Sequence, residues 1–160
     1  MIPKDAINEA LSLLPSKMDS NKARVMLVAI GLQESRFLHR RQLVGNPPKP
    51  TGPATGFWQF ERGGGVAGVL RHKSTSIIAR DICEKRGVKP ESFDVWEALQ
   101  RDDVLAAAFA RLLLWTDPKS IPDEADVDGA WDLYIRTWRP GKPHRSTWDS
   151  LHKEAVEAVT

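Results

Sequence analysis

The sequence of 160 residues has a single cysteine, Cys83, and no long apolar run. One cysteine excludes a disulfide framework within the chain, and the apolar neighbours of Cys83 at helical spacing predict a buried thiol. The longest apolar run, Val25 to Leu32, has eight residues, whereas a membrane-spanning helix needs about 20. Because the N-terminus also lacks a basic start followed by an apolar segment, we expect no export signal and no membrane span.

Excess charge is also small. The chain carries 23 Lys and Arg against 21 Asp and Glu, a formal net charge of +2, which does not by itself indicate a nucleic-acid binder. The distribution is uneven, with basic stretches at 36–49 and 136–145 and an acidic stretch at 117–132. These stretches are either the solvated faces of a mixed surface or, for the basic ones, the wall of a cleft for an anionic polymer.

Metal and cofactor motifs are missing. The four histidines form no HExxH or Cys/His pattern, so we expect no metal site. Gly63, Gly65 and Gly68 match G-x-G-x-x-G, but a dinucleotide site needs a preceding buried strand and an acid about 20 residues further on. Asp81 lies only 13 residues beyond Gly68. We therefore expect no organic cofactor and interpret these glycines as a mobile loop or a helix entry.

Tryptophan, glycine and proline are present in unusual places. There are 6 Trp but only 1 Tyr, and 6 of the 11 Gly and 4 of the 11 Pro fall within residues 45–65. That stretch is expected to be neither regular helix nor core strand. The length predicts one domain, residues 1–160.

Helical spacing of apolar residues dominates the rest of the chain. Ser20 or Asn21, and Asp102 or Asp103, are expected to start helices, Gly87 is expected to end one, and the patterns beginning at Asp94 and Ser146 have capping-box spacing. Only residues 55–61 could form a short strand or hairpin. The predicted fold is mainly α, with a central buried helix and a small irregular or β lobe around residues 45–65. The expected helices are about 3–14, 20–37, 76–86, one starting near 94, 104–115, 128–138 and 146–158.

One carboxylate occupies a position where an apolar residue is expected. In the helix predicted for residues 20–37, Glu34 falls on the same face as Leu27 and Ile30. A buried carboxylate is costly unless it is paired, protonated or at the edge of a cleft. Glu34 is thus either an ion-pair partner of a cation such as Arg36 or Arg40, or an acid of raised pKa, as a general acid working near neutral pH requires.

A second cluster follows 22 to 27 residues later, in the sequence Gly56-Phe57-Trp58-Gln59-Phe60-Glu61. Aromatic rings beside hydrogen-bonding side chains suit a saccharide, whose rings have apolar faces and polar rims. The same cluster could also be a minor core where the loop docks. As a strand, it would place Phe57, Gln59 and Glu61 on one face and Trp58 and Phe60 on the other.

Glu34-Ser35 at the end of an apolar helix, followed by Gly56-Phe57-Trp58-Gln59-Phe60, resembles the E-S and G-x-x-Q-F/M motifs of soluble lytic transglycosylases and goose-type lysozyme-like enzymes. The segment 134–141 lies where that family carries its Tyr-Asn-Ala-Gly element, although Ile135-Arg136 replaces Asn-Ala. Residues 104–115 lie where the family has its third, helical motif. The resemblance spans residues 25–141 and implies a lysozyme-like fold.

The resemblance implies cleavage of the bond between N-acetylmuramic acid and N-acetylglucosamine in peptidoglycan, with Glu34 as the catalytic acid/base. It further implies that Tyr134 helps to hold Glu34 and that Glu61 is the candidate second carboxylate if the enzyme is a hydrolytic muramidase instead of a transglycosylase. The other implied contacts to the sugar are Ser35, Phe57, Gln59, Phe60, Glu61, Tyr134 and Trp138.

The resemblance is strongest to bacteriophage proteins that cleave peptidoglycan. It implies synthesis in the host cytoplasm, action at the bacterial cell wall or periplasm, glycan strands as the partner, and possible contacts with virion structural proteins, but no nucleic acid. Two other classes stay open. One is a DNA-associated helical protein that uses the basic residues of 136–145 with Trp138 and Trp148. The other is a structural virion or wall-binding module without catalysis.

Overall fold

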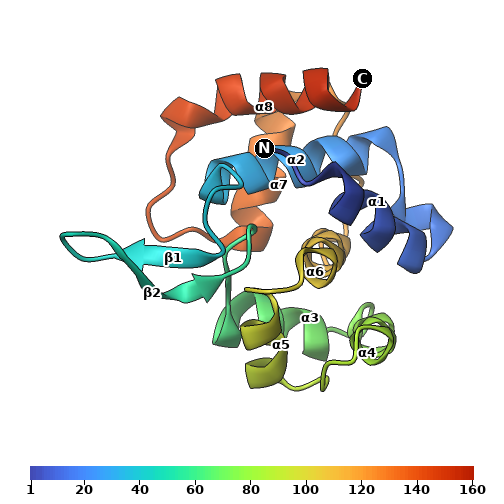
Figure 1. Ribbon diagram of the computed structural model, residues 1–160. Helices are drawn as coiled ribbons and strands as arrows, with labels where there is room; N and C mark the ends of the chain where they lie inside the picture. The colour runs from blue at the N-terminus through green and yellow to red at the C-terminus, as the bar shows by residue number, and fades with distance from the viewer.

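The computed structural model describes all residues from 1 to 160 and is mainly helical (Figure 1). Two short helical turns, η1 (Ser16–Met18) and η2 (Arg62–Val66), accompany eight α-helices. The prediction of a mainly α fold is confirmed. The helices are α1 (Lys4–Leu13), α2 (Asn21–Ser35), α3 (Ala67–Arg71), α4 (Ser76–Lys85), α5 (Ser92–Ala98), α6 (Asp103–Trp115), α7 (Val127–Trp138) and α8 (Arg145–Val159).

A three-stranded antiparallel sheet, in the order β1-β2-β3, forms the non-helical lobe. Its strands are β1 (Arg41–Val44), β2 (Lys49–Thr55) and β3 (Phe60–Glu61), and the β1–β2 hairpin projects from the helices (Figure 1). The sheet therefore begins well before residues 55–61, the only stretch where a strand was expected. The prolines and the glycine of β2 give this segment the composition of a loop. It nevertheless forms a strand, most of whose residues are exposed. At its bulge the Gln42 side chain accepts a hydrogen bond from the Ala54 N–H, 3.1 Å away.

Several helix ends lie where the sequence predicts them. The Ser20 hydroxyl accepts a hydrogen bond from the Ala23 N–H at the start of α2, and the Asp102 carboxylate accepts one from the Leu105 N–H at the start of α6. Gly87, with φ of 70°, follows the end of α4. The capping boxes expected at Asp94 and Ser146 do not form, because α5 and α8 begin earlier, after extended or irregular backbone, and enclose both residues.

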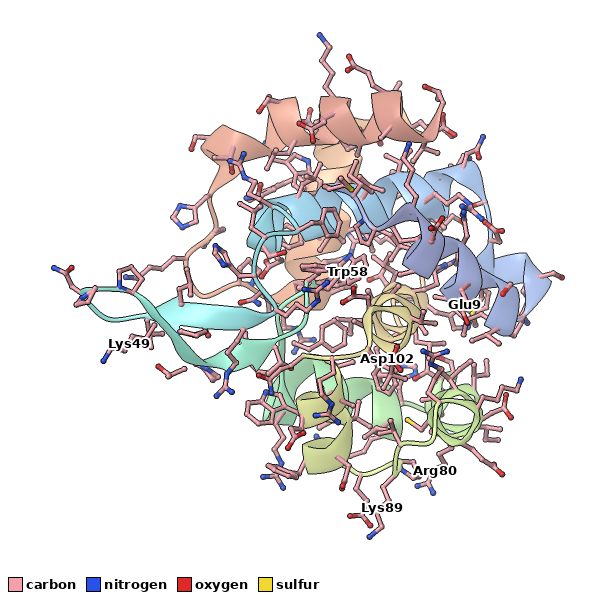
Figure 2. The ribbon with its side chains drawn as sticks, in the orientation of Figure 1. Glu9, Lys49, Trp58, Arg80, Lys89 and Asp102 are labelled. Atoms are coloured by element: carbon pink, nitrogen blue, oxygen red, sulfur yellow. The ribbon has the colours of Figure 1, made fainter.

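One core joins the helices to the lobe. Its 41 buried residues include most of α6, which Figure 1 shows end-on in the middle of the molecule, and the apolar side chains of residues 25–32 of α2, a helix that packs beside α8. Trp58 and Trp148 are fully buried, and Figure 2 shows Trp58 near the centre of the molecule. Trp96, Trp115 and Trp131 pack against the core with part of each ring exposed.

Other expectations can be compared directly with the fold. Burial of Cys83 raises the pKa of its thiol to about 11, so the buried-thiol prediction is confirmed. The glycine-rich segment forms η2 and leads into α3, which confirms a helix entry. Many groups in the charged stretches pair at the surface, among them Arg40 with Asp103 at 2.9 Å and Lys22 with Asp123 at 2.8 Å. No helix has the length and apolar character needed to cross a membrane.

Candidate functional site

Glu34 lies in the last turn of α2, two residues after the buried run 25–32. Its carboxyl group is largely withdrawn from water. Burial raises the pKa of Glu34 from 4.5 to about 7, and a hydrogen bond from Tyr134 opposes part of this rise. At neutral pH the group is therefore close to half protonated, so it can both give and accept a proton.

Tyr134 of α7 is the direct partner of Glu34. Its hydroxyl donates a hydrogen bond to Glu34 Oε2. Burial and the neighbouring carboxylate raise the pKa of Tyr134, so its hydroxyl keeps its proton and acts as a donor. The tyrosine ring stacks on Trp148 with a centroid distance of 5.3 Å and an interplanar angle of 7°. With Trp131 5.5 Å away on another side, the ring has little freedom to leave Glu34.

Neither Arg36 nor Arg40 forms an ion pair with Glu34. Arg36 ends α2 in the left-handed conformation, with φ of 56°, and is exposed. Arg40 binds both carboxylate oxygens of Asp103 at 2.9 Å and lies 4.3 Å from the centre of the Phe57 ring. The ion-pair alternative considered for Glu34 is therefore wrong with respect to Arg36 and Arg40.

Ser35 connects the end of α2 to the turn that carries the second motif. Its hydroxyl donates a hydrogen bond to the Phe57 carbonyl at 2.7 Å and accepts one from the Phe37 N–H at 3.1 Å. The side chain is buried. Ser35 thus positions the motif turn against Glu34's helix, and the expectation that it contacts the sugar does not fit this placement.

The aromatic residues of the second motif are buried, so their burial does not support the predicted sugar contacts of Phe57 and Phe60. Residues 56–59 form a turn, with Gln59 at φ of 53°, so the strand alternation expected over 56–61 does not occur. Phe57 and Phe60 are 5% and 2% exposed. Trp58 donates its indole N–H to the Leu27 carbonyl at 2.8 Å, which fixes the turn on α2. These rings therefore belong to the core, as the minor-core interpretation requires, and Phe60 also lines the larger cavity described next.

Two adjoining cavities form a groove beside Glu34. The smaller has a volume of about 260 Å³ and contains Glu34, and the larger has a volume of about 510 Å³. Four residues line both, so the cavities are continuous along one groove: Gln59, Glu61, Trp138 and Arg139. Among the residues predicted to contact sugar, Gln59, Glu61, Tyr134 and Trp138 line the smaller cavity with Glu34.

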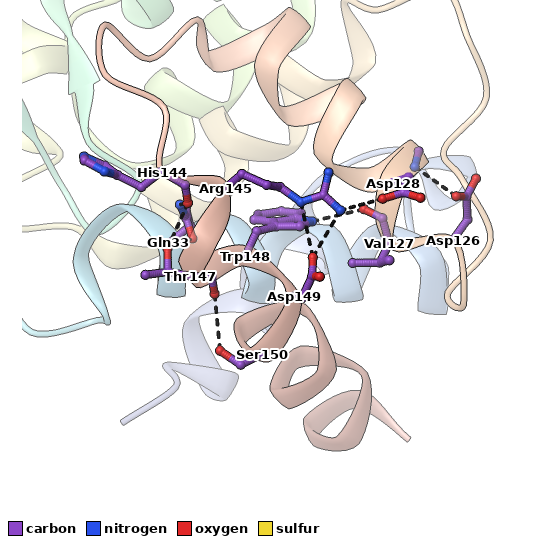
Figure 3. Close-up of polar contacts among 11 residues, drawn as sticks. Gln33, Asp126, Val127, Asp128, His144, Arg145, Thr147, Trp148, Asp149 and Ser150 are labelled. Atoms are coloured by element: carbon purple, nitrogen blue, oxygen red, sulfur yellow. Dashed lines mark hydrogen bonds and ion pairs between the residues drawn. The ribbon is translucent and has the colours of Figure 1, made fainter.

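The loop 139–144 between α7 and α8 forms another wall of the smaller cavity. The side chain of Gln33, the neighbour of Glu34, donates to the His144 carbonyl and accepts from the Thr147 hydroxyl, both at 2.9 Å. Figure 3 shows these contacts at the start of α8. At the other end of the loop, Trp138 donates its indole N–H to the Trp58 carbonyl at 2.8 Å. The loop is therefore fixed at both of its ends.

Several groove residues were not identified by their sequence patterns. Gln33 and Gln42 give no signal, because their contacts depend on chain segments far away in sequence. Arg139 belongs to the basic stretch 136–145, for which a cleft wall was one of two interpretations. Arg71 of α3 is followed by His72 and Lys73, a short basic cluster outside the two basic stretches noted above, and it becomes part of the groove only through the fold.

The alternating cations and aromatics of 136–145 do not share one exposed face. Trp148 is fully buried, Arg136 pairs with Asp117 at 3.0 Å, and Arg145 pairs with Asp128 and Asp149. A buried indole cannot stack on a base. This arrangement gives the DNA-associated alternative no support. No group of three or more His, Cys, Asp or Glu side chains is placed to hold a metal ion.

Comparison with known proteins gives no relative from which a function could be transferred. No family model, no curated protein and no solved structure matches the chain.

Proposed function

We propose that this protein is a lysozyme-like enzyme that cleaves the glycan strand of peptidoglycan as a lytic transglycosylase. The observation that carries the proposal is the state of Glu34: a carboxyl group at the end of an apolar helix, with a pKa of about 7, bonded to Tyr134 and lining a groove. A helical body with a hairpin lobe beside the groove supports a lysozyme-like fold.

In this mechanism a single carboxyl group serves twice. Protonated Glu34 gives its proton to the oxygen of the bond between N-acetylmuramic acid and N-acetylglucosamine, and the bond breaks through an oxocarbenium-like state. The resulting carboxylate then takes the proton from the C6 hydroxyl of the muramic acid, whose oxygen bonds to C1. The product is a 1,6-anhydro end, water is not consumed, and Glu34 is again protonated. Tyr134 holds Glu34 in place throughout.

A hydrolytic muramidase is the second candidate, because Glu61 lines the same cavity as Glu34. In that reaction Glu61 would activate a water that attacks C1 after Glu34 has protonated the leaving oxygen. Glu61 is exposed at the edge of the lobe. Its replacement by Gln should have little effect on a transglycosylase and should abolish a muramidase that inverts configuration.

The test is the clearing of suspended peptidoglycan by the wild-type protein and by Glu34→Gln. The amide retains an oxygen that can accept the Tyr134 hydrogen bond but supplies no acidic proton, so we expect activity to fall by at least about a thousandfold while binding to the sacculi remains. Glu154→Gln, on the exposed face of α8, is the matched control and should keep full activity. Mass analysis of the products separates anhydro ends from reducing ends. A fully active Glu34→Gln protein would exclude the mechanism, and an inactive wild-type protein that still binds would indicate a wall-binding module.

A further inference from the structure

The larger cavity contains two cations with no acidic partner. Arg71 of α3 and Arg139 after α7 both line it, and each guanidinium donates only to a backbone carbonyl, of Ala67 and Arg136 respectively. Arg136 lines the same cavity but is satisfied by Asp117 through two hydrogen bonds of 3.0 and 3.1 Å. The protein thus neutralises one of its three cavity arginines and leaves two free.

The acidic groups around these arginines do not balance them. Glu61 is the only carboxylate that lines the larger cavity. On the side of Glu34, the exposed Lys142 of loop 139–144 adds another cation. The groove therefore has a local excess of positive charge, although the whole chain has a net charge of only +2.

Glycine keeps the cavity open next to these cations. Gly63, Gly64, Gly65 and Gly68 all line it. A Cβ atom added at Gly63 or Gly68 would meet nothing within 4 Å, so this side of the cavity has room for a ligand group. The volume of about 510 Å³ exceeds what a few ordered waters need.

We propose that the larger cavity binds a carboxylate of the peptide attached to the glycan strand that is cut beside Glu34. This inference rests on the proposed function and names the part of the substrate that the protein recognises in addition to the glycan strand. Guanidinium groups bind carboxylates through paired, charge-assisted hydrogen bonds, and Arg71 and Arg139 have donors to spare. Because the cavity is continuous with that of Glu34 through Gln59 and Trp138, one strand can occupy both. A neutral N-acetylglucosamine polymer would offer no partner to these arginines.

The test compares native peptidoglycan with the same material after its carboxyl groups have been converted to amides by carbodiimide and ammonia. We expect the wild-type protein to cleave the amidated material at least about tenfold more slowly, because one lost charge-assisted contact corresponds to about that factor. The double variant Arg71→Gln/Arg139→Gln should cleave native peptidoglycan at the slow rate and should no longer distinguish the two substrates.

The matched control is Arg80→Gln/Lys89→Gln, which removes the same charge from exposed positions that do not line the groove. Figure 2 shows Arg80 and Lys89 on the part of the molecule away from Lys49 of the hairpin. The control should behave as the wild type. If it loses activity as the groove variant does, the effect is general attraction and the proposal is wrong.

Binding of each protein to sacculi, measured by co-sedimentation in the Glu34→Gln background, separates this proposal from the proposed function. The carboxylate site is supported, even if no cleavage occurs, when amidation weakens binding of the protein with intact arginines. The Arg71→Gln/Arg139→Gln variant should then bind native and amidated sacculi equally. Equal binding to native and amidated material overturns it. Binding that is lost only when phosphodiester polymers are removed with hydrofluoric acid assigns the arginines to phosphate and also overturns it.

Discussion

At the scale of single residues, the contribution of Glu34 to the free energy of unfolding depends on pH. Its pKa is about 7 in the folded protein and about 4.5 in an unfolded chain. Between these values the folded state holds a proton that the unfolded state has lost, so the free energy of unfolding falls as the pH rises. A difference of this size corresponds to about 3 kcal/mol. The carboxyl group thus destabilises the fold at neutral and alkaline pH.

We therefore expect Glu34→Gln to be more stable than the wild type at pH 8, by about 1–3 kcal/mol, and nearly equal to it at pH 4. Urea unfolding across this pH range measures the difference. Glu154→Gln removes a carboxylate that stays in water in the folded protein and should show no such trend. A constant difference between Glu34→Gln and wild type from pH 4 to 8 would contradict the burial of Glu34.

Tyr134 sets how far the pKa of Glu34 rises, because its hydrogen bond lowers that pKa against the effect of burial. Tyr134→Phe should therefore raise the pKa of Glu34 further. If Glu34 acts as the general acid, the alkaline fall of kcat/KM moves to higher pH in this variant, in addition to any loss of rate from poorer positioning. A fall that stays in place or moves to lower pH would show that Glu34 does not govern the profile.

At the scale of elements, Ser35 holds the second motif turn against α2. Ser35→Ala removes the partner of the buried Phe57 carbonyl and of the Phe37 N–H. Leaving such groups unpaired costs about 1–3 kcal/mol. We expect a lower urea midpoint with an unchanged slope, and reduced activity because Gln59 belongs to the same turn.

The matched control is Ser12→Ala in α1, where the hydroxyl is exposed and bonds only the Glu9 carbonyl. Its effect on stability should stay within about 0.5 kcal/mol. An equal loss of unfolding free energy in both variants would mean that the hydrogen bond between Ser35 and Phe57 does not contribute to stability beyond an exposed one.

Helices could be predicted from local sequence, whereas the sheet could not. The caps at Ser20 and Asp102 are interactions within four residues, so spacing alone locates them. The β1–β2 hairpin depends on the pairing of two segments, one of which is rich in proline and glycine and shows no strand pattern. The alternation expected over 56–61 fails because residues 56–59 form a turn, with Gln59 in the left-handed conformation, and Phe57 is buried together with Trp58 and Phe60.

At the scale of the whole molecule, the helices and the lobe share one core. Phe57, Trp58 and Phe60 of the lobe belong to the same buried cluster as α2 and α6. We expect one cooperative unfolding transition, with far-ultraviolet and near-ultraviolet circular dichroism giving the same midpoint. Two separate midpoints would indicate that the lobe folds independently of the helices.

The candidate site could be predicted only in part at this scale. Glu34 was identifiable because a charged residue interrupts an apolar helical face. Its contact with Tyr134, 100 residues away, was implied by resemblance alone, since no spacing rule reaches that far. The groove arginines Arg71 and Arg139 come from different helix ends, so only the tertiary fold brings them to one cavity.

The position of Trp138 makes the tryptophan fluorescence of the protein sensitive to the groove. It is the only tryptophan that lines either cavity, while Trp58 and Trp148 are fully enclosed in the core. A ligand that displaces water from this indole changes the polarity around one emitter and leaves the enclosed ones unaffected. The intrinsic fluorescence of the protein therefore reports occupancy of the groove without a label, and a shift of its emission to shorter wavelength marks the filling of the cavities beside Glu34.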